Sequence, residues 1–109
     1  LNNIADALVE SKNPDLDQAL RLVNQAIVLM PDEPHVHDTR GKIFLRMGEP
    51  VKAIADFEKA LKAEDLRPIA HARLAEAYRA IGNTQRSAFH EAMVESHRKV
   101  IEKRNGRTP

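Results

Sequence analysis

The chain has 109 residues, of which 42% are hydrophobic and 30% charged, and its net charge is +1. That size fits a single domain, and the balance of side chains is neither that of a disordered chain nor that of a membrane protein. No apolar run reaches the roughly 18–20 residues that cross a bilayer, and the lack of cysteine excludes disulfides, thiolate metal sites and cysteine nucleophiles.

Helix-forming residues dominate the sequence, and no segment alternates as a β-strand would. Pro14, Pro34 and Pro50 stand where the first turn of a helix accepts proline. Gly48 and Gly82 stand where a helix would end in a left-handed turn. The predicted helices are, in chain order, 1–11, 14–30, 34–47, 50–63, 67–81 and 84–104. Short loops between them predict that neighbouring helices lie antiparallel.

Similar residues recur at a spacing of 34 along the chain. The matching positions are Gly48 and Gly82, Phe44 and Tyr78, His37 and His71, Gly41 and Ala75, Ala19 and Ala53, and Ala26 and Ala60. Small residues allow close helix approach, and larger residues fill the space between helical pairs. One such pair cannot bury its apolar face alone, so stacked pairs are expected to build a continuous core.

This pattern resembles the tetratricopeptide repeat family. Residues 34–65 match it best, because they carry its small residue, aromatic, turn glycine and second-helix series at Gly41, Phe44, Gly48, Ala53, Phe57 and Ala60. The resemblance covers about residues 1–95. It implies an all-α fold, a right-handed α-solenoid of three helix-turn-helix repeats with an extended C-terminal closing helix. The expected repeats are about 1–33, 34–66 and 67–95, followed by an extension of the last helix and a basic tail at 96–109.

Several positions depart from the family pattern. Arg40 stands where the family prefers leucine, and His37 and His71 stand where it often has tryptophan. Ser87 and Glu91 replace the alanine and the aromatic expected in the last helix. We therefore expect that helix to keep one face on the third pair and the other in solvent.

No motif in the sequence indicates catalysis or a cofactor. Phosphate-binding loops, zinc-protease motifs and nucleophile elbows are all missing. His35 and His37 lie on different helix faces, and His90 and His97 are two turns apart, so neither pair predicts a metal site. His37 and His71 occupy equivalent places in successive repeats, which favours packing at the boundary between pairs.

The resemblance implies a concave face lined by the first helix of each pair. Outward-facing residues there would include Val9 and Thr39. The candidate partner-binding set is Asn3, Asp6, Glu10, Asp38, Lys42, Arg46, Arg73, Glu76 and Arg79. Such a groove is mixed in sign and would suit an extended or helical peptide. The alternative is that many of these charges are ordinary surface residues.

The sequence argues against one specific ligand of the family. Some members hold the C-terminal carboxylate of heat-shock chaperones with two lysines, two asparagines and an arginine. The equivalent places here are Asn2, Asp6, Thr39, Ile69 and Arg73. Only Arg73 matches, and Asp6 would repel a carboxylate, so binding of a chaperone tail is not expected.

The two ends of the chain suggest a second class of function. Leu1, Ile4 and Leu8 form an apolar face that a preceding repeat would cover, so we expect either a longer parent protein or a homodimer. Residues 98–107 carry a net charge of +4. This basic segment is open to three interpretations: a solvated end, a surface for self-association or a partner, and a nucleic-acid contact, which the lack of stacking aromatics disfavours.

The sequence therefore predicts a non-catalytic scaffold or adaptor that binds a protein or peptide in its groove. The alternative is a structural self-assembly module that uses the solenoid ends and the closing helix. Neither nucleic acid nor a membrane is an expected partner. The composition favours a soluble, cytoplasmic chain, and its compact turns favour a bacterial source.

Overall fold

The computed structural model describes residues 2–10 and 15–106, and within these ranges the chain is helical with no strand. The elements are α1 (Asn2–Glu10), α2 (Leu16–Leu29), α3 (Pro34–Arg46), α4 (Pro50–Ala60), the short 3₁₀ helix η1 (Glu64–Leu66), α5 (Arg67–Ala80) and α6 (Thr84–Arg104). The all-helical prediction is confirmed. The helix predicted for 50–63 ends at Ala60, and a turn then leads into η1.

Local chemistry sets the helix boundaries. Asp15 and Asn83 cap α2 and α6, since a side-chain oxygen of each accepts a backbone N–H three residues later at 3.0 Å. Pro34 and Pro50 open α3 and α4. The turns after α3 and α5 contain glycines with φ of 77° and 80°, a left-handed conformation that side chains disfavour.

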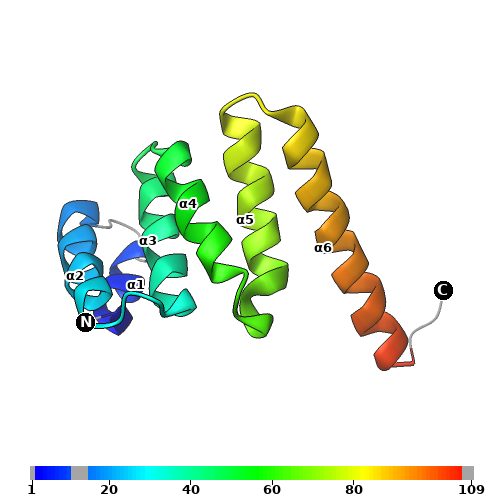
Figure 1. The fold of residues 1–109 in the computed structure, drawn as a ribbon, viewed down its shortest axis with the longest axis horizontal. Helices are drawn as coiled ribbons and strands as arrows, with labels where there is room; N and C mark the ends of the chain where they lie inside the picture. The colour runs from blue at the N-terminus through cyan, green and yellow to red at the C-terminus, as the bar shows by residue number, and fades with distance from the viewer. Residues whose placement is uncertain (1, 11–14, 107–109) are drawn as a thin grey trace.

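The helices follow one another in a row, as Figure 1 shows from α1 and α2 at one end to α6 at the other. Each helix packs on the next in sequence, and α1 also contacts α3. The molecule extends over 45 × 31 × 28 Å. Consecutive helices run antiparallel, and the lower end of α6 stands away from α5 in this view.

The core consists of two clusters of buried side chains. The first joins α1, α2 and α3 through Ala5, Val9, Ala19, Val23, Ala26, Val36 and Ile43. The second joins α4 and α5 through Ala53, Phe57, Leu74 and Tyr78. Alanine at the helix contacts allows the close approach that the sequence pattern predicts.

Gly41 and Phe57 form a close contact between α3 and α4. A Cβ atom added at Gly41 would lie 2.5 Å from the Phe57 ring, so only glycine fits beside this aromatic. The positions 34 residues later hold Ala75 and Glu91. Because Glu91 is exposed and no aromatic lies there, the larger residue Ala75 is accommodated.

Polar Ser87 occupies a place where the earlier pairs have alanine. It is buried, and its hydroxyl donates to the Ala75 carbonyl at 2.9 Å. Beyond Ser87 and His90, the side chains of α6 are exposed or half-buried. The expectation that α6 keeps one face in solvent is therefore consistent with the structure.

Candidate functional site

A shallow groove follows the first helix of each pair. Its cavity of ≈ 160 Å³ is lined by Val9 of α1, Lys42, Leu45 and Arg46 of α3, and Arg73 and Glu76 of α5; we call it the first-helix groove. These residues are distant in sequence but converge because α1, α3 and α5 lie on the same side of the row. Four of them belong to the set predicted from the sequence: Lys42, Arg46, Arg73 and Glu76.

Ion pairs between successive first helices cross this groove. Lys42 of α3 pairs with Asp6 of α1, and Arg73 of α5 pairs with Asp38 of α3, at 2.7 Å in the second case. Arg46 also donates to the backbone carbonyl of Val9 at 3.2 Å. The positive charges in the groove thus meet acceptors supplied by the preceding pair, which links neighbouring pairs together.

Some residues expected to face outward are buried instead. Val9, Asp38 and Thr39 are 3%, 7% and 3% exposed. Val9 joins the first core cluster, Thr39 donates to the His35 carbonyl at 3.1 Å, and Asp38 points to Arg73. Solvent therefore reaches only a small part of these three residues, although Val9 still borders the first-helix groove.

The remaining predicted residues lie elsewhere. Arg79 pairs with Glu91 of α6 and does not line the first-helix groove. Asn3 is exposed on α1 without lining it. The side chain of Glu10 lies outside the described residues.

A buried charge cluster of Arg40, Asp56 and His37 was not predicted from the sequence. Asp56 is 2% exposed and accepts two hydrogen bonds from Arg40, at 2.8 and 2.9 Å. The same carboxylate lies 2.9 Å from Nδ1 of His37, whose Nε2 lies 2.7 Å from the Pro31 carbonyl. Both partners of His37 are acceptors, so the full set of hydrogen bonds needs a proton on each ring nitrogen.

The sequence did contain a sign of this cluster. Arg40 breaks the apolar pattern on the inner side of α3, and Asp56 interrupts the alanine and aromatic series of α4. Two irregularities on adjacent helices can compensate each other, as this bidentate pair does. His37 contacts both its own pair and the preceding turn, which agrees only in part with the expected packing at the boundary between pairs.

His71 does not fit the expected packing at the boundary between pairs, because its hydrogen bond and ring contacts lie within its own helical pair. Its Nδ1 lies 2.9 Å from Nδ1 of His90, and the rings of both residues are almost fully buried. Burial is the main reason that the pKa of each ring lies below its ordinary value. His90 also stacks on Tyr78, with ring centroids 5.6 Å apart.

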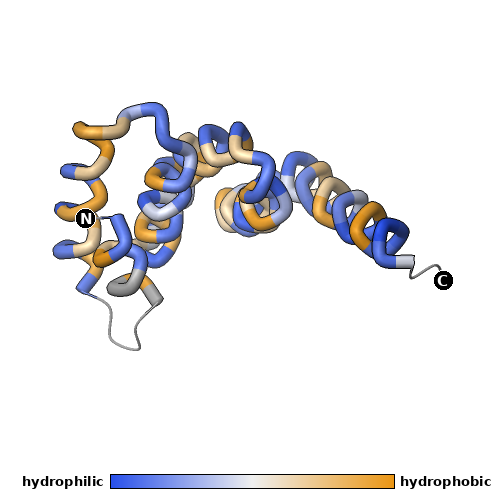
Figure 2. The backbone as a smooth tube through the Cα atoms, turned by 90° about the horizontal axis from the view of Figure 1, so that it is seen from below, coloured by the Kyte–Doolittle hydropathy of each residue, from blue (hydrophilic) through white to orange (hydrophobic). Residues whose placement is uncertain are grey.

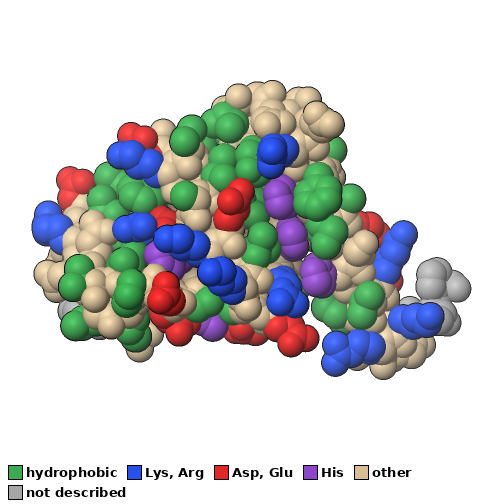
Figure 3. Space-filling view, viewed as in Figure 1, with side chains coloured by type: hydrophobic (Ala, Val, Ile, Leu, Met, Phe, Trp, Pro, Cys, Tyr) green, Lys and Arg blue, Asp and Glu red, His purple; other side chains and the backbone are tan. Residues whose placement is uncertain are grey.

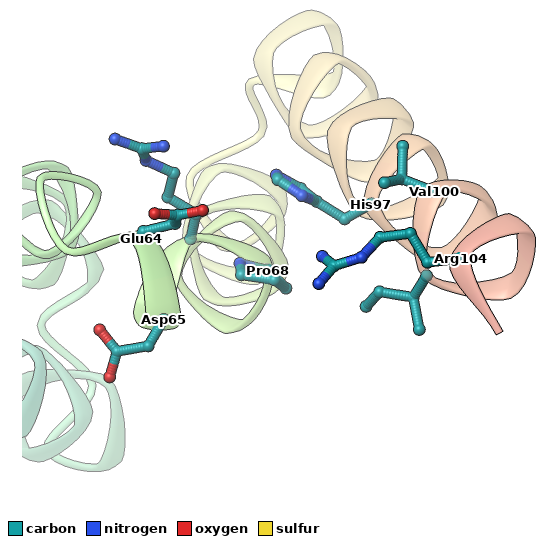
Figure 4. Close-up of a pocket in the computed structure, with 8 residues that line it drawn as sticks. Glu64, Asp65, Pro68, His97, Val100 and Arg104 are labelled. Atoms are coloured by element: carbon teal, nitrogen blue, oxygen red, sulfur yellow. The ribbon is translucent and has the colours of Figure 1, made fainter.

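A larger cleft lies between the start of α5 and the far end of α6. It has a volume of ≈ 740 Å³ and is lined by Glu64, Asp65, Arg67, Pro68, His97, Val100, Ile101 and Arg104; we call it the α6 cleft. In Figure 4, His97 and Arg104 reach from α6 toward Pro68 on the opposite wall. The two walls carry apolar side chains together with charges of both signs.

Other kinds of site find no support in the described part of the chain. There, no three histidine or acidic side chains group closely enough to bind a metal ion, and no helix is long and apolar enough to cross a membrane. Comparison of the sequence and structure with family models, curated proteins and solved structures gives no match. The first-helix groove and the α6 cleft are therefore the basis for a functional proposal.

Proposed function

We propose that the chain is a non-catalytic binding module, a right-handed α-solenoid of tetratricopeptide-like repeats whose first-helix groove receives a segment of a partner protein. The observation that carries the proposal is the convergence of side chains from α1, α3 and α5 on one groove. A surface shared by successive helical pairs suits an elongated ligand, because such a ligand can contact several pairs at once.

The charges of the groove indicate what kind of segment fits. Lys42 and Arg73 already face Asp6 and Asp38, so a strongly acidic ligand would have to compete with internal carboxylates. Glu76 is exposed at the groove and can accept a basic side chain. Leu45 is half-buried and supplies an apolar contact. We infer a peptide of alternating apolar and charged residues with a basic residue beside Glu76.

Peptide display tests this proposal directly. A random library would be selected against the chain, and the dissociation constants of the selected peptides measured for the parent and for the double variant Arg46→Glu with Glu76→Arg. This variant reverses both exposed charges of the groove and keeps the net charge. The reversed charges should repel the selected peptides and weaken their binding to the double variant at least about tenfold.

Arg21→Glu is the matched control, because Arg21 is exposed on α2, outside the first-helix groove. It should bind the selected peptides as the parent does. Selected peptides that bind the double variant as tightly as the parent would contradict groove binding, provided that both proteins have equal helicity.

Self-assembly is the second candidate, and the α6 cleft favours it. Val100 and Ile101 are 55% and 48% exposed there. Glu64 and Asp65 border one wall and Arg104 the other, and Figure 2 shows apolar residues near the end of α6 among hydrophilic ones. In a two-fold dimer, Arg104 of one α6 would meet Glu64 on the opposite wall of the second copy, beside Arg67 and the Asp65 that pairs with His35.

Light scattering over a range of concentrations tests this candidate. A dimer that Ile101→Lys dissociates and Val28→Lys leaves intact would support it, because Val28 is exposed on α2, away from the α6 cleft. A monomer at every concentration would contradict it and leave groove binding as the proposal.

A further inference from the structure

Three histidine rings lie side by side where α5 meets α6. The ring centroid of His71 lies 5.1 Å from that of His90 and 5.9 Å from that of His97. Figure 3 shows histidine side chains in a row between these two helices. His71 and His90 are 7% and 8% exposed, so this contact is part of the interface that holds α6.

The hydrogen bond between His71 and His90 restricts how many protons the pair can carry. The two Nδ1 atoms are 2.9 Å apart, and such a bond needs one donor and one acceptor. At least one ring must therefore be neutral. If both rings carried two protons, two donors and two positive charges would face each other in a poorly solvated place.

We propose that this histidine pair is an acid-sensitive latch, which keeps α6 docked on α5 while the hydrogen bond is intact and releases α6 when both rings are protonated. The wall of the α6 cleft formed by His97, Val100, Ile101 and Arg104 would move with the helix. Acidification would therefore remove this cleft and leave the first-helix groove in place.

The surroundings of His71 favour its neutral form. Burial lowers the pKa of His71 most. Positive charge on the side chains of His90, His97 and Arg67 lowers it further. The neutral form predominates in the docked state, whereas a released ring would regain its ordinary pKa of about 6.5. The docked state is thus stabilised above that value, and this stability is lost as the pH falls toward the lowered pKa.

Some groups around His90 lower its pKa and others raise it. Burial lowers its pKa most, Glu58 of α4 opposes this effect, and Arg86 of α6 adds to it. Tyr78 stacks on the ring and donates its hydroxyl to Glu58 at 3.1 Å, which engages part of that carboxylate. The net direction for His90 remains downward, as for His71.

The second helical pair supplies an internal comparison. His37 and Asp56 occupy places 34 residues before His71 and His90, at the same separation of 2.9 Å. There the partner is a carboxylate, which can only accept, so the contact needs a hydrogen on Nδ1 of His37. Changing His90 to aspartate would copy the histidine–carboxylate contact, although Leu74 stands where Arg40 binds Asp56 in the second pair, and should therefore reverse the response of the third pair to acid.

The packing of α6 allows release without disruption of the main core. Where α4 buries Phe57 completely, α6 has the exposed residue Glu91. The buried residues of α6 are Ser87 and His90 alone among those described. Although α6 packs on α5 as extensively as α4 packs on α3, a helix that buries so few of its own side chains can separate at a lower free-energy cost than α4.

The test combines a proton titration with amide exchange on the whole chain. NMR titration of the imidazole protons gives the pKa values of His71 and His90 without any substitution, and both should lie below about 6.5. Hydrogen exchange of α6 amides, corrected for intrinsic rates, gives the opening constant. This constant should rise at least about tenfold between pH 7.5 and 5.5, since each proton taken up allows up to tenfold per pH unit, while the amides of α3 and α4 stay protected.

Two variants separate the latch from a general effect of acid. His90→Asn accepts a hydrogen bond without titrating, so it should reduce the pH dependence of α6 to the part that His71 alone contributes. His90→Asp should make α6 more protected at pH 5.5 than at pH 7.5. Titration of both histidines at or above the ordinary value, or equal α6 exchange at both pH values in the parent, would overturn the proposal.

Discussion

His37 and His71 lie 34 residues apart in the sequence, and each places its Nδ1 2.9 Å from a side chain that follows 19 residues later. The partner is the carboxylate of Asp56 in one case and the imidazole of His90 in the other. Successive helical pairs therefore share one geometry but differ in the charge that this geometry stabilises. This difference gives each pair its own response to substitution of the second residue.

Gly41→Ala should destabilise the protein by about 1–3 kcal/mol, because the added methyl group would lie against the Phe57 ring. Phe57→Ala should cost about 3–5 kcal/mol, because Phe57 is fully buried. Urea unfolding of the two single variants and the double variant measures their coupling. If the cost of Gly41→Ala were the same with and without the Phe57 ring, the α3–α4 contact described here would be wrong.

Asp56→Ala should cost about 3–5 kcal/mol, because it leaves Arg40 and His37 without their shared acceptor in a buried place. Arg40→Leu should cost less, since His37 still pairs with Asp56. As a control, Asp32→Ala removes an exposed carboxylate and should change the free energy of unfolding by less than about 0.5 kcal/mol. Equal stability of the Asp56 and Asp32 variants in urea would show that the cluster contributes nothing.

Ser87→Ala should change stability by less than about 1 kcal/mol, because alanine occupies the equivalent places in the earlier pairs and the lost hydrogen bond goes to a helix carbonyl. Ser87→Leu should instead cost about 1–3 kcal/mol by overpacking the α5–α6 contact. Thermal unfolding distinguishes the two. A Ser87→Leu variant that unfolds at the same temperature as the parent would mean that α6 does not pack closely on α5 at this position.

His35 should titrate above its ordinary pKa. Hydrogen bonds to Asp65 and then to Glu33 raise the pKa of this ring, which lies 2.8 and 2.7 Å from the two carboxylates. The contribution of this bridge to stability is present below the ordinary pKa and is lost as the pH rises through the raised value.

NMR titration measures this pKa directly. Asp65→Asn should lower it more than Glu33→Gln does, since Asp65 is the larger cause. An imidazole that titrates below about 6.5 in the parent would contradict the bridge between the start of α3 and η1.

Much of the fold could be predicted from the sequence, because prolines and glycines mark the helix boundaries and the apolar residues keep helical spacing. The resemblance to the repeat family implied a set of groove residues, of which Lys42, Arg46, Arg73 and Glu76 line one groove. All four residues lie on the first helices of the second and third pairs, α3 and α5.

What the sequence could not predict depends on the reach of individual side chains. Asp38 is hidden because Arg73, 35 residues later, extends over it. Arg79 turns to Glu91 of α6 rather than to the first-helix groove. Periodicity predicts which face of a helix a residue lies on. The position of its charged group depends on the rotamer and on the available partner, and both depend on neighbouring helices.

The measurement that most directly tests the central claim is an NMR titration of the isotopically labelled chain with a peptide selected by display. The account predicts that chemical-shift changes concentrate on the residues around the first-helix groove, on α1, α3 and α5. Changes centred on the α6 cleft, at Pro68, Val100 and Ile101, with none in the first-helix groove would contradict the claim and place recognition at the end of the row of helices.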